Sequence, residues 1–222
     1  MNLSQLTQAI QAYAENTESL FVSNIPLFLS QAELRIYNSV QIPVLRKNVT
    51  GVVTTNNPYL SCPNDFMAVY SLAAVDTLGS YNYLIDKDVS FIREAYPNPT
   101  VTGLPKYYAI FGPQLVDPKE LSLIITPTPD ANYSVELHYY YMPESITVAA
   151  SGTTWLSDNY DPVLFYGAMR EAMIFMKGEA DMVGYYENKY QEALLQLKRL
   201  GDGLERGDSY RNNQTKIPYS TL

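Results

Sequence analysis

TTWLSDNYDPVLFYGAMREAMIFMKGEADMVGYYENKYQEALLQLKRL, which spans residues 153–200, decides the fold of this chain. It contains the only tryptophan, Trp155, and two helix patterns that are separated by Gly178. Apolar side chains occur nearly all round residues 163–176, which predicts a helix that is buried on most sides. In residues 179–200 the apolar side chains form one stripe opposite charged residues: Val183, Tyr186, Tyr190, Leu194, Leu197 and Leu200. The clearest pattern of the chain is thus a packing pattern, which indicates a protein that is built to assemble.

The helix of residues 163–176 carries its own start signals. Ser157 or Asp158 is predicted to cap it, because both side chains accept hydrogen bonds from free backbone N–H groups. Asp161 places negative charge at its N-terminus, and Pro162 suits its first turn. The sequence therefore predicts that this helix begins close to residue 160.

Two further helices are predicted near the N-terminus. The first covers residues 4–16, where apolar residues recur at spacings of three and four. The second begins near Pro26, whose fixed φ suits a first turn, with Asn24 as its cap. Pro43 is predicted to end it, because proline cannot continue a helix.

The middle of the chain has the pattern of strands and turns. Residues 49–53 and 59–60 flank the turn-rich residues 55–58, which predicts a hairpin. In residues 133–141 apolar and polar side chains alternate with a period of two, which is typical of a half-buried strand. The other predicted elements are strands over residues 66–75, 81–85, 106–111 and 121–126, and a short helix over residues 89–95 capped by Asp88.

These elements predict an α+β protein with three parts. Residues 1–45 and 151–200 are expected to form one discontinuous α-helical bundle, since chain ends of the same type usually pack together. Residues 46–150 form a β-rich, antiparallel insertion between the helical pairs. Residues 201–222 are polar, contain no core pattern, and are predicted to be an extended C-terminal arm that orders on binding.

The composition excludes several classes of protein. A formal net charge of −8 argues against a tight grip on the nucleic-acid backbone, which needs clustered Lys and Arg. The 20 tyrosines are about three times the average share, and such rings suit protein contacts because they join apolar area to a polar hydroxyl. No signal peptide and no membrane span are expected, so that synthesis in the cytoplasm is expected.

Candidate catalytic and metal-binding residues are few. The single histidine, His138, lies in a tyrosine-rich strand without a nucleophile motif, and is interpreted as a hydrogen-bonded or solvent-facing sheet residue. Cys62 has no partner and is expected to be a small buried apolar residue. Asp86, Asp88 and Glu94 lack the loop pattern of a calcium site. We therefore predict no catalytic residue, no cofactor and no metal ion.

Several segments, spread over almost the whole chain, resemble the head-to-tail adaptors (connectors) of tailed phages, especially of short-tailed phages. The most characteristic segment is residues 153–158 (TTWLSD) together with Glu171–Ala172 and residues 175–180 (FMKGEA). The others are residues 25–26 and 32–37 (AELRIY), 60–66 (LSCPNDF), 92–97 (IREAYP), 102–108 (TGLPKYY), 126–129 (TPTP) and 139–145 (YYYMPES). None of these segments is a catalytic signature, so the resemblance depends on their order along the chain.

The resemblance implies a structural virion protein that carries no enzymatic residues. Such adaptors form a ring, commonly of twelve copies, beneath the portal at the neck of the virion. The ring holds the tail nozzle or tail tube below it, and DNA passes through its axial channel without sequence-specific binding. The helical bundle builds the ring wall in this family, and a terminal arm docks onto the portal. The chain would then be made in the host cytoplasm and end in the virion.

Three sets of candidate contact residues follow from this resemblance and from the side-chain chemistry. The polar C-terminal arm carries sparse anchors that are predicted to contact the portal: Tyr210, Arg211, Ile217, Pro218 and Tyr219. Large side chains of the opening stretch are predicted to pack in the ring: Trp155, Phe165, Met169, Phe175 and Met176. Tyrosines of the β insertion are predicted to contact the tail: Tyr83, Tyr107 and Tyr140.

Two other functions fit parts of the sequence. A carbohydrate- or receptor-binding β module would use tyrosine faces to stack on sugar rings, and circular dichroism with little helix would favour it. A carboxylate-dependent hydrolase is supported only by the 23 acidic residues, and an activity screen against glycans and peptidoglycan would test it.

Overall fold

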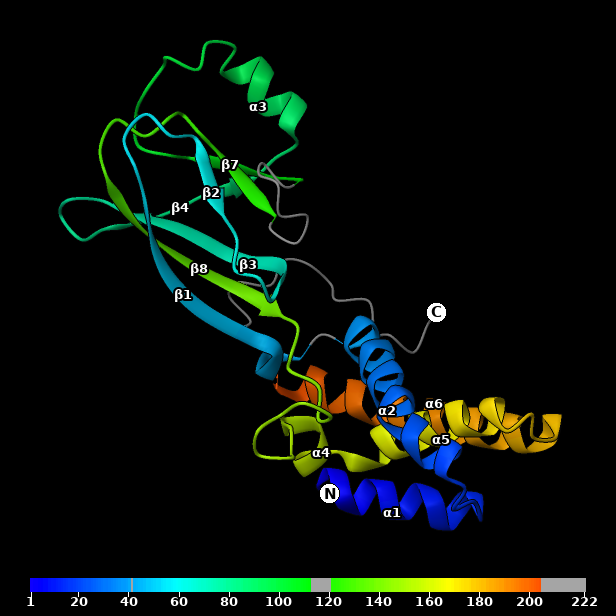
Figure 1. The fold of residues 1–222 in the computed structure, drawn as a ribbon. Helices are drawn as coiled ribbons and strands as arrows, with labels where there is room; N and C mark the ends of the chain where they lie inside the picture. Colours follow the sequence, from blue (N-terminus) through cyan, green and yellow to red (C-terminus); the bar gives the residue numbers. More distant parts are fainter. Residues whose placement is uncertain (41, 113–120, 205–222) are drawn as a thin grey trace. The chain divides into compact units, whose positions relative to one another are not determined.

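A computed structural model describes residues 1–40, 42–112 and 121–204. It confirms the predicted α+β class, with helices and two β-sheets (Figure 1). The chain divides into two compact units. The helical unit consists of Met1–Val44 together with Glu144–Leu222, and the β unit consists of Leu45–Pro143. Each unit has its own hydrophobic core.

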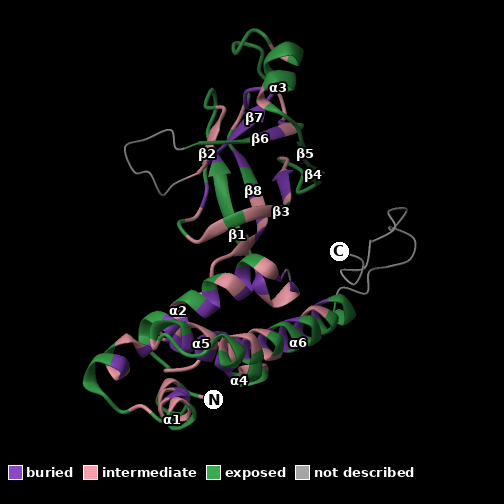
Figure 2. Cartoon of the chain, turned by 90° about the vertical axis from the view of Figure 1, so that its right-hand side faces the viewer, coloured by how far each residue is buried: buried purple, intermediate pink, exposed green. Residues whose placement is uncertain are grey.

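The helical unit is organised around one central helix. Its helices are α1 (Leu3–Ala14), α2 (Ser19–Ser39), α4 (Trp155–Asn159), α5 (Asp161–Phe175) and α6 (Ala180–Leu204). Helices α1, α2, α4 and α6 all contact α5. Eight residues of α5 are buried, as its apolar pattern predicted: Val163, Leu164, Phe165, Gly167, Ala168, Met169, Ala172 and Met173. Figure 2 shows this burial, and shows exposed residues along the outer side of α6.

Gly167 allows α2 and α6 to approach α5 closely. A Cβ atom at this position would lie 3.0 Å from Ala32 Cβ on α2 and 3.3 Å from the ring of Tyr190 on α6. Tyr190 is itself 1% exposed, so its ring has little freedom to move away. A glycine in the middle of a helix usually lowers stability. At position 167 a glycine is nevertheless required, because three helices pack too closely for a side chain there.

Two helix starts differ from the predictions. Helix α2 begins at Ser19, seven residues before Pro26, which lies inside the helix. Phe21 and Ile25 are 1% and 0% exposed, and burial of these side chains offsets the cost of an interior proline. Ser157 and Asp158 do not cap α5, because both lie within the short helix α4.

The predicted break between the last two helices is confirmed, but the last helix extends further than predicted. Helix α5 ends at Phe175, Lys177 adopts a left-handed φ of 56°, and Gly178 N donates to Met173 O at 2.9 Å. Helix α6 continues through a buried Gly201 to Leu204. The first four residues of the predicted arm are therefore helical, and residues 205–222 lie outside the described residues.

The β unit contains two four-stranded sheets that share one core. Sheet A has the order β1 (Arg46–Val53), β8 (Tyr133–Tyr141), β3 (Phe66–Val75) and β4 (Tyr81–Tyr83). Sheet B has the order β2 (Tyr59–Ser61), β7 (Ser122–Thr126), β6 (Tyr107–Phe111) and β5 (Ile85–Asp86). The short helix α3 (Val89–Ala95) follows β5 in the sequence. The shared core contains Val53, Leu72, Leu123, Ile125, Val135, Leu137 and Tyr139, and Cys62 is buried with them as predicted. Among the described residues the strand pairs are antiparallel, as predicted, except for the short pair of β5 with β6, which is parallel.

The hairpin predicted around residues 55–58 is wrong. Strand β1 pairs over its whole length with β8, from Arg46 opposite Tyr140 to Val53 opposite Tyr133, whereas β2 pairs with β7 in the other sheet. The connecting segment bonds to a different loop, since Thr55 N donates to Asn132 Oδ1 at 2.9 Å. A nine-residue partner strand offers β1 a longer ladder than the three residues of β2 could.

Candidate interaction surfaces

The five residues predicted to pack in a ring differ in their access to solvent. Met169 is 0% exposed and Phe165 is 9% exposed, so that both belong to the core of the helical unit. Phe175 is 41% exposed and contacts Phe28, with 5.3 Å between the ring centroids. Trp155 and Met176 are half-buried. Of these five residues, therefore, only Trp155, Phe175 and Met176 keep surface that a neighbouring chain can reach.

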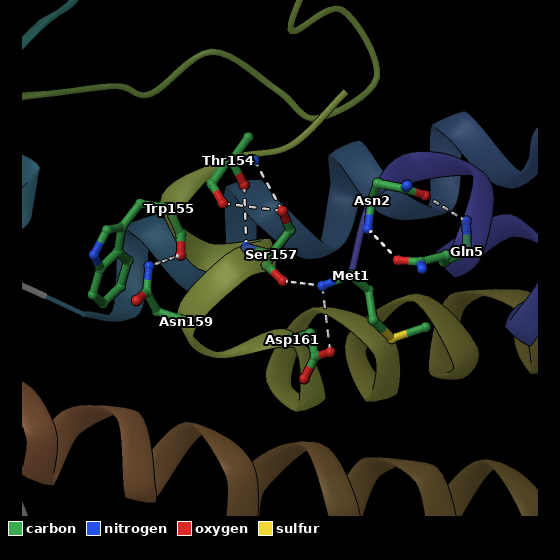
Figure 3. A network of polar contacts seen from close by, with 8 residues as sticks. All are labelled: Met1, Asn2, Gln5, Thr154, Trp155, Ser157, Asn159 and Asp161. Atoms are coloured by element: carbon green, nitrogen blue, oxygen red, sulfur yellow. Dashed lines mark hydrogen bonds and ion pairs between the residues drawn. The ribbon is translucent and has the colours of Figure 1, made fainter. Parts of the chain in front are cut away.

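Trp155 is positioned by a capping box at the start of α4. Thr154 N donates to Ser157 Oγ at 2.9 Å, and Ser157 N donates to Thr154 Oγ1 at 3.3 Å (Figure 3). A second capping box, between Asn2 and Gln5, starts α1 nearby. These reciprocal hydrogen bonds satisfy backbone donors that would otherwise be free at the helix starts.

The starts of α1, α4 and α5 are bonded together. The backbone nitrogen of Met1 donates to the Ser157 carbonyl oxygen and lies 3.5 Å from Asp161 Oδ2 (Figure 3). Leu3 N donates to Gly152 O at 2.9 Å. The segment that the sequence pattern singled out is thus an anchoring point for the N-terminal helix.

A charged cluster links α2, α5 and α6. Arg35 on α2 lies 2.7 Å from Glu171 on α5, Arg170 lies 2.8 Å from the same carboxylate, and Arg170 also pairs with Glu187 on α6. Burial alone would raise the pKa of Glu187, but a hydrogen bond from Gln191 and the charge of Arg170 hold it below its usual value. The cluster therefore favours the ionised carboxylate of Glu187.

Two of the three tyrosines predicted to contact the tail lie together. Tyr83 and Tyr107 line one cavity of about 380 Å³ in the β unit, which we call the tyrosine hollow. Its other lining residues are Tyr81, Asn82, Ile85, Leu104, Pro105 and Lys106. Tyr83 is 63% exposed, whereas the Tyr107 ring packs edge-on against Phe91 at 5.7 Å. The hollow thus combines exposed aromatic rings, apolar walls and one cationic side chain.

Tyr140 lies elsewhere, on the outer face of sheet A. Arg46 donates to its hydroxyl at 2.8 Å, and the Arg46 guanidinium lies 4.0 Å from the centroid of the Tyr70 ring. In the strand register, Tyr140 lies opposite Ala68 of β3, and Tyr83 lies opposite Ala73 of the same strand. The two positions are therefore about 17 Å apart along β3. The hollow and Tyr140 are therefore distinct parts of the surface.

The structure places a serine beside His138, which the sequence pattern did not predict. Ser71 Oγ lies 3.2 Å from His138 Nδ1, because the register pairs these two residues across β3 and β8. On the other side, Glu136 Oε1 lies 3.7 Å from His138 Nε2, which is too long for a hydrogen bond, and it accepts from Asn48 Nδ2 at 2.6 Å. In a Ser-His-acid site, a hydrogen bond from the histidine to the carboxylate orients the imidazole. Glu136 does not make this hydrogen bond with His138, so we assign no catalytic role to Ser71, His138 and Glu136.

Cys62 is a buried free thiol of the β unit. Burial raises the pKa of the Cys62 thiol to about 11, which keeps it protonated at neutral pH. Within residues 1–40, 42–112 and 121–204, no group of three or more His, Cys, Asp or Glu side chains is arranged to hold a metal ion. No helix in the described part of the chain combines the length and hydropathy that a membrane span requires.

Comparison with models of protein families gives a match over most of the chain. The family model described as "SU10 adaptor protein" matches residues 1–215, which is nearly the whole chain. No curated protein matches the sequence. The anchors of the predicted portal-binding arm, Tyr210, Arg211, Ile217, Pro218 and Tyr219, lie outside the described residues, although the first two fall within the matched range.

Proposed function

The chain belongs to the SU10 adaptor family, and from this membership we propose that it forms the head-to-tail adaptor ring of a phage. The family is one of structural phage proteins, so the chain is a virion component with an adaptor role. In our proposal the ring, of about twelve copies, docks under the portal at the neck and carries the tail nozzle or tail tube. The observation that carries the proposal is the family match over residues 1–215.

The charge of the chain supports passage of DNA through such a ring. The net charge of −8 repels the phosphate backbone, which reduces sequence-independent binding to the channel wall. DNA can then move along the axis without being held. A purified ring that bound duplex DNA tightly at physiological salt would contradict this part of the proposal.

We assign the portal contact to the C-terminal arm. The support is its composition, because isolated large side chains in a polar segment suit an extended peptide that orders on binding. Deletion of residues 210–222 should abolish attachment to portal rings and leave the thermal unfolding of the chain unchanged. A truncated chain that still attached with wild-type affinity would move the portal contact to another part of the chain.

We assign the tail contact to the tyrosine hollow. Exposed tyrosines beside apolar walls are typical of protein interfaces, and Lys106 would favour an acidic or carbonyl-rich segment of the partner. Tyr83→Ala should weaken tail attachment about tenfold or more, as for a residue central to an interface. Tyr185→Ala on α6 is the matched control, because Tyr185 is similarly exposed, at 52% against 63%. Equal attachment by both variants would exclude the hollow.

One experiment tests the proposal as a whole. The mass of the full chain is measured alone and then mixed with purified portal rings of the same phage. We expect one of two results. Either a species of ring size forms only in the mixture, or the chain alone already forms a ring that then binds the portal. A chain that neither self-associates nor binds the portal would refute the proposed ring.

A further inference from the structure

Helix α2 has an exposed face with a regular pattern of side chains. Leu20, Leu27 and Leu34 are 66%, 50% and 50% exposed, and they recur at every seventh residue. Ser23 and Ser30 lie between them, so that the five residues follow the alternating spacing of three and four that brings side chains onto one helix seam. We call these five residues the leucine seam.

The seam lies opposite the buried face of the same helix. The buried side chains of α2 that pack in the helical unit include Phe21, Ile25, Leu29, Ala32 and Ile36. At 100° per residue these side chains point away from the seam. The three leucines are therefore not required by the core of their own chain. Three large apolar side chains at heptad spacing on an exposed helix face are typical of a face that packs against another helix.

The polar groups of the seam already have partners within the helix. Ser23 Oγ donates to Leu20 O at 2.9 Å, and Ser30 Oγ donates to Leu27 O at 3.0 Å. Asn24 Nδ2, beside the seam, donates to Leu20 O at 2.7 Å. Removing these groups from water leaves no serine hydroxyl donor unsatisfied, so the usual cost of burying polar groups is small here. The serines then act as small residues between leucines, which lets a facing helix approach closely.

Helices α1 and α2 themselves contain few charged residues, and the exposed Glu15 and Glu18 lie in the segment that connects them. Helix α1 contains no charged residue, and the 21 residues of α2 contain only Glu33, which is 2% exposed, and Arg35, which is paired with Glu171. The 25 residues of α6, in contrast, contain seven charged residues. Depletion of charge is what distinguishes the centre of a protein interface from the rest of a surface.

The scarcity of charge on this face favours a second copy of this chain as its occupant. Copies of one chain with a net charge of −8 repel each other, and opposing carboxylates across an interface cost several kcal/mol. Two copies can meet on an uncharged face without that cost. We propose that the leucine seam of α2 is the surface on which a second copy of this chain packs a helix. This inference rests on the proposed ring and names the surface that joins its subunits.

The size of the seam predicts how such copies associate. A helix of 21 residues is about 31 Å long, so a single helix contact covers roughly 300 Å² on each partner. Stable protein pairs bury about 800 Å² on each partner. The seam is therefore one part of a ring contact and is too small to hold an isolated dimer at low concentration. Association through the seam should strengthen when the portal gathers the copies.

The test is site-specific photo-crosslinking in the full-length chain bound to portal rings. A benzophenone amino acid replaces Leu27 in one variant and Leu195 in the control. Leu195 is a comparable leucine, 38% exposed, on the charged helix α6. We expect a covalent dimer of the chain from position 27, at a yield at least tenfold above that from position 195. Crosslinks from position 27 to the portal only, or a yield equal to the control, would overturn the inference.

A failure of the proposed ring can be told apart from a failure of the seam. If the unmodified chain does not bind the portal, the proposed function fails, and the same two variants are irradiated in a concentrated solution of the chain alone. A dimer from position 27 there still supports the seam, and its absence excludes the seam. Leu27→Asp should reduce assembly at least tenfold with little change in thermal unfolding, whereas Leu195→Asp should assemble normally.

Discussion

Helices α2 and α6 both pack on α5, yet their outer faces differ in chemistry. Both inner faces are mainly apolar, because the same core must be buried, and Glu33 on α2 is the exception. The outer face of α6 carries charges in both signs, whereas that of α2 carries leucine, serine, glutamine and asparagine. Burial against α5 therefore does not determine the outer chemistry. We infer that the outer face follows its surroundings, which are water for α6 and protein for α2.

The largest effect on stability is expected at Gly167, because both α2 and α6 pack against this residue of α5. Gly167→Leu would place a side chain against Ala32 of α2 and Tyr190 of α6, which lie 3.0 and 3.3 Å from the position of its Cβ. Overpacking of this kind costs about 1–3 kcal/mol, and we expect the upper end because both neighbours are buried. The free energy of unfolding in urea measures the loss.

Gly184 on α6 is the matched control for Gly167. A Cβ at Gly184 would meet nothing within 4 Å, so Gly184→Ala should raise the unfolding free energy by about 0.5–1 kcal/mol. The two glycine substitutions are thus expected to have opposite signs. A loss of stability below about 0.5 kcal/mol for Gly167→Leu would show that the three helices do not approach as closely as described.

The second effect is expected from Glu33, the buried carboxyl group of α2, which differs from the exposed charged groups of α6 in its pH dependence. Burial raises the pKa of Glu33 above its usual value, and hydrogen bonds from Ser145 and from Ile146 N, at 2.9 Å, only partly offset this. A raised pKa means that wild-type stability falls as the pH rises from the unfolded-state pKa through the folded-state pKa. Glu33→Gln keeps an acceptor for Ile146 and should remove this loss.

The measurement is urea unfolding of the wild-type chain and of Glu33→Gln over a pH series. We expect Glu33→Gln to be the more stable at pH 7, with a difference that disappears as the pH falls below the unfolded-state pKa of Glu33. Glu192→Gln on α6 is the control, because Glu192 is 60% exposed and should show no such difference. A wild-type chain that is more stable at pH 7 than Glu33→Gln would exclude burial as the main influence on Glu33.

Strong local patterns were sufficient to predict many elements. The strand of residues 133–141 and the helix of residues 89–95 have the predicted bounds, because alternation and flanking turn residues act within a few positions. The all-round apolar pattern of residues 163–176 correctly predicted a buried helix. Asp88 occupies the predicted cap position of α3, although its side chain makes no capping hydrogen bond.

Features that depend on distant residues were not predictable in this way. The interior Pro26 is tolerated because Phe21 and Ile25 pack in the helical unit, and the first strand pairs with β8, about 90 residues later. The contact of Ser71 with His138 depends on strand register. The leucine seam was also hidden, since α2 has leucines on both faces and spacing alone does not show which face meets α5.

The smallest effect is expected from an exposed ion pair on α6. Lys189 Nζ lies 3.2 Å from Glu192 Oε2, and an exposed pair of this kind contributes at most about 0.5 kcal/mol. Lys189→Ala should therefore change the unfolding free energy by less than about 0.5 kcal/mol and leave assembly on portal rings unchanged. If Lys189→Ala lost assembly while Leu27→Asp kept it, the subunit contact would belong to the charged helix. The correlation between an uncharged outer face and a protein neighbour would then fail for this molecule.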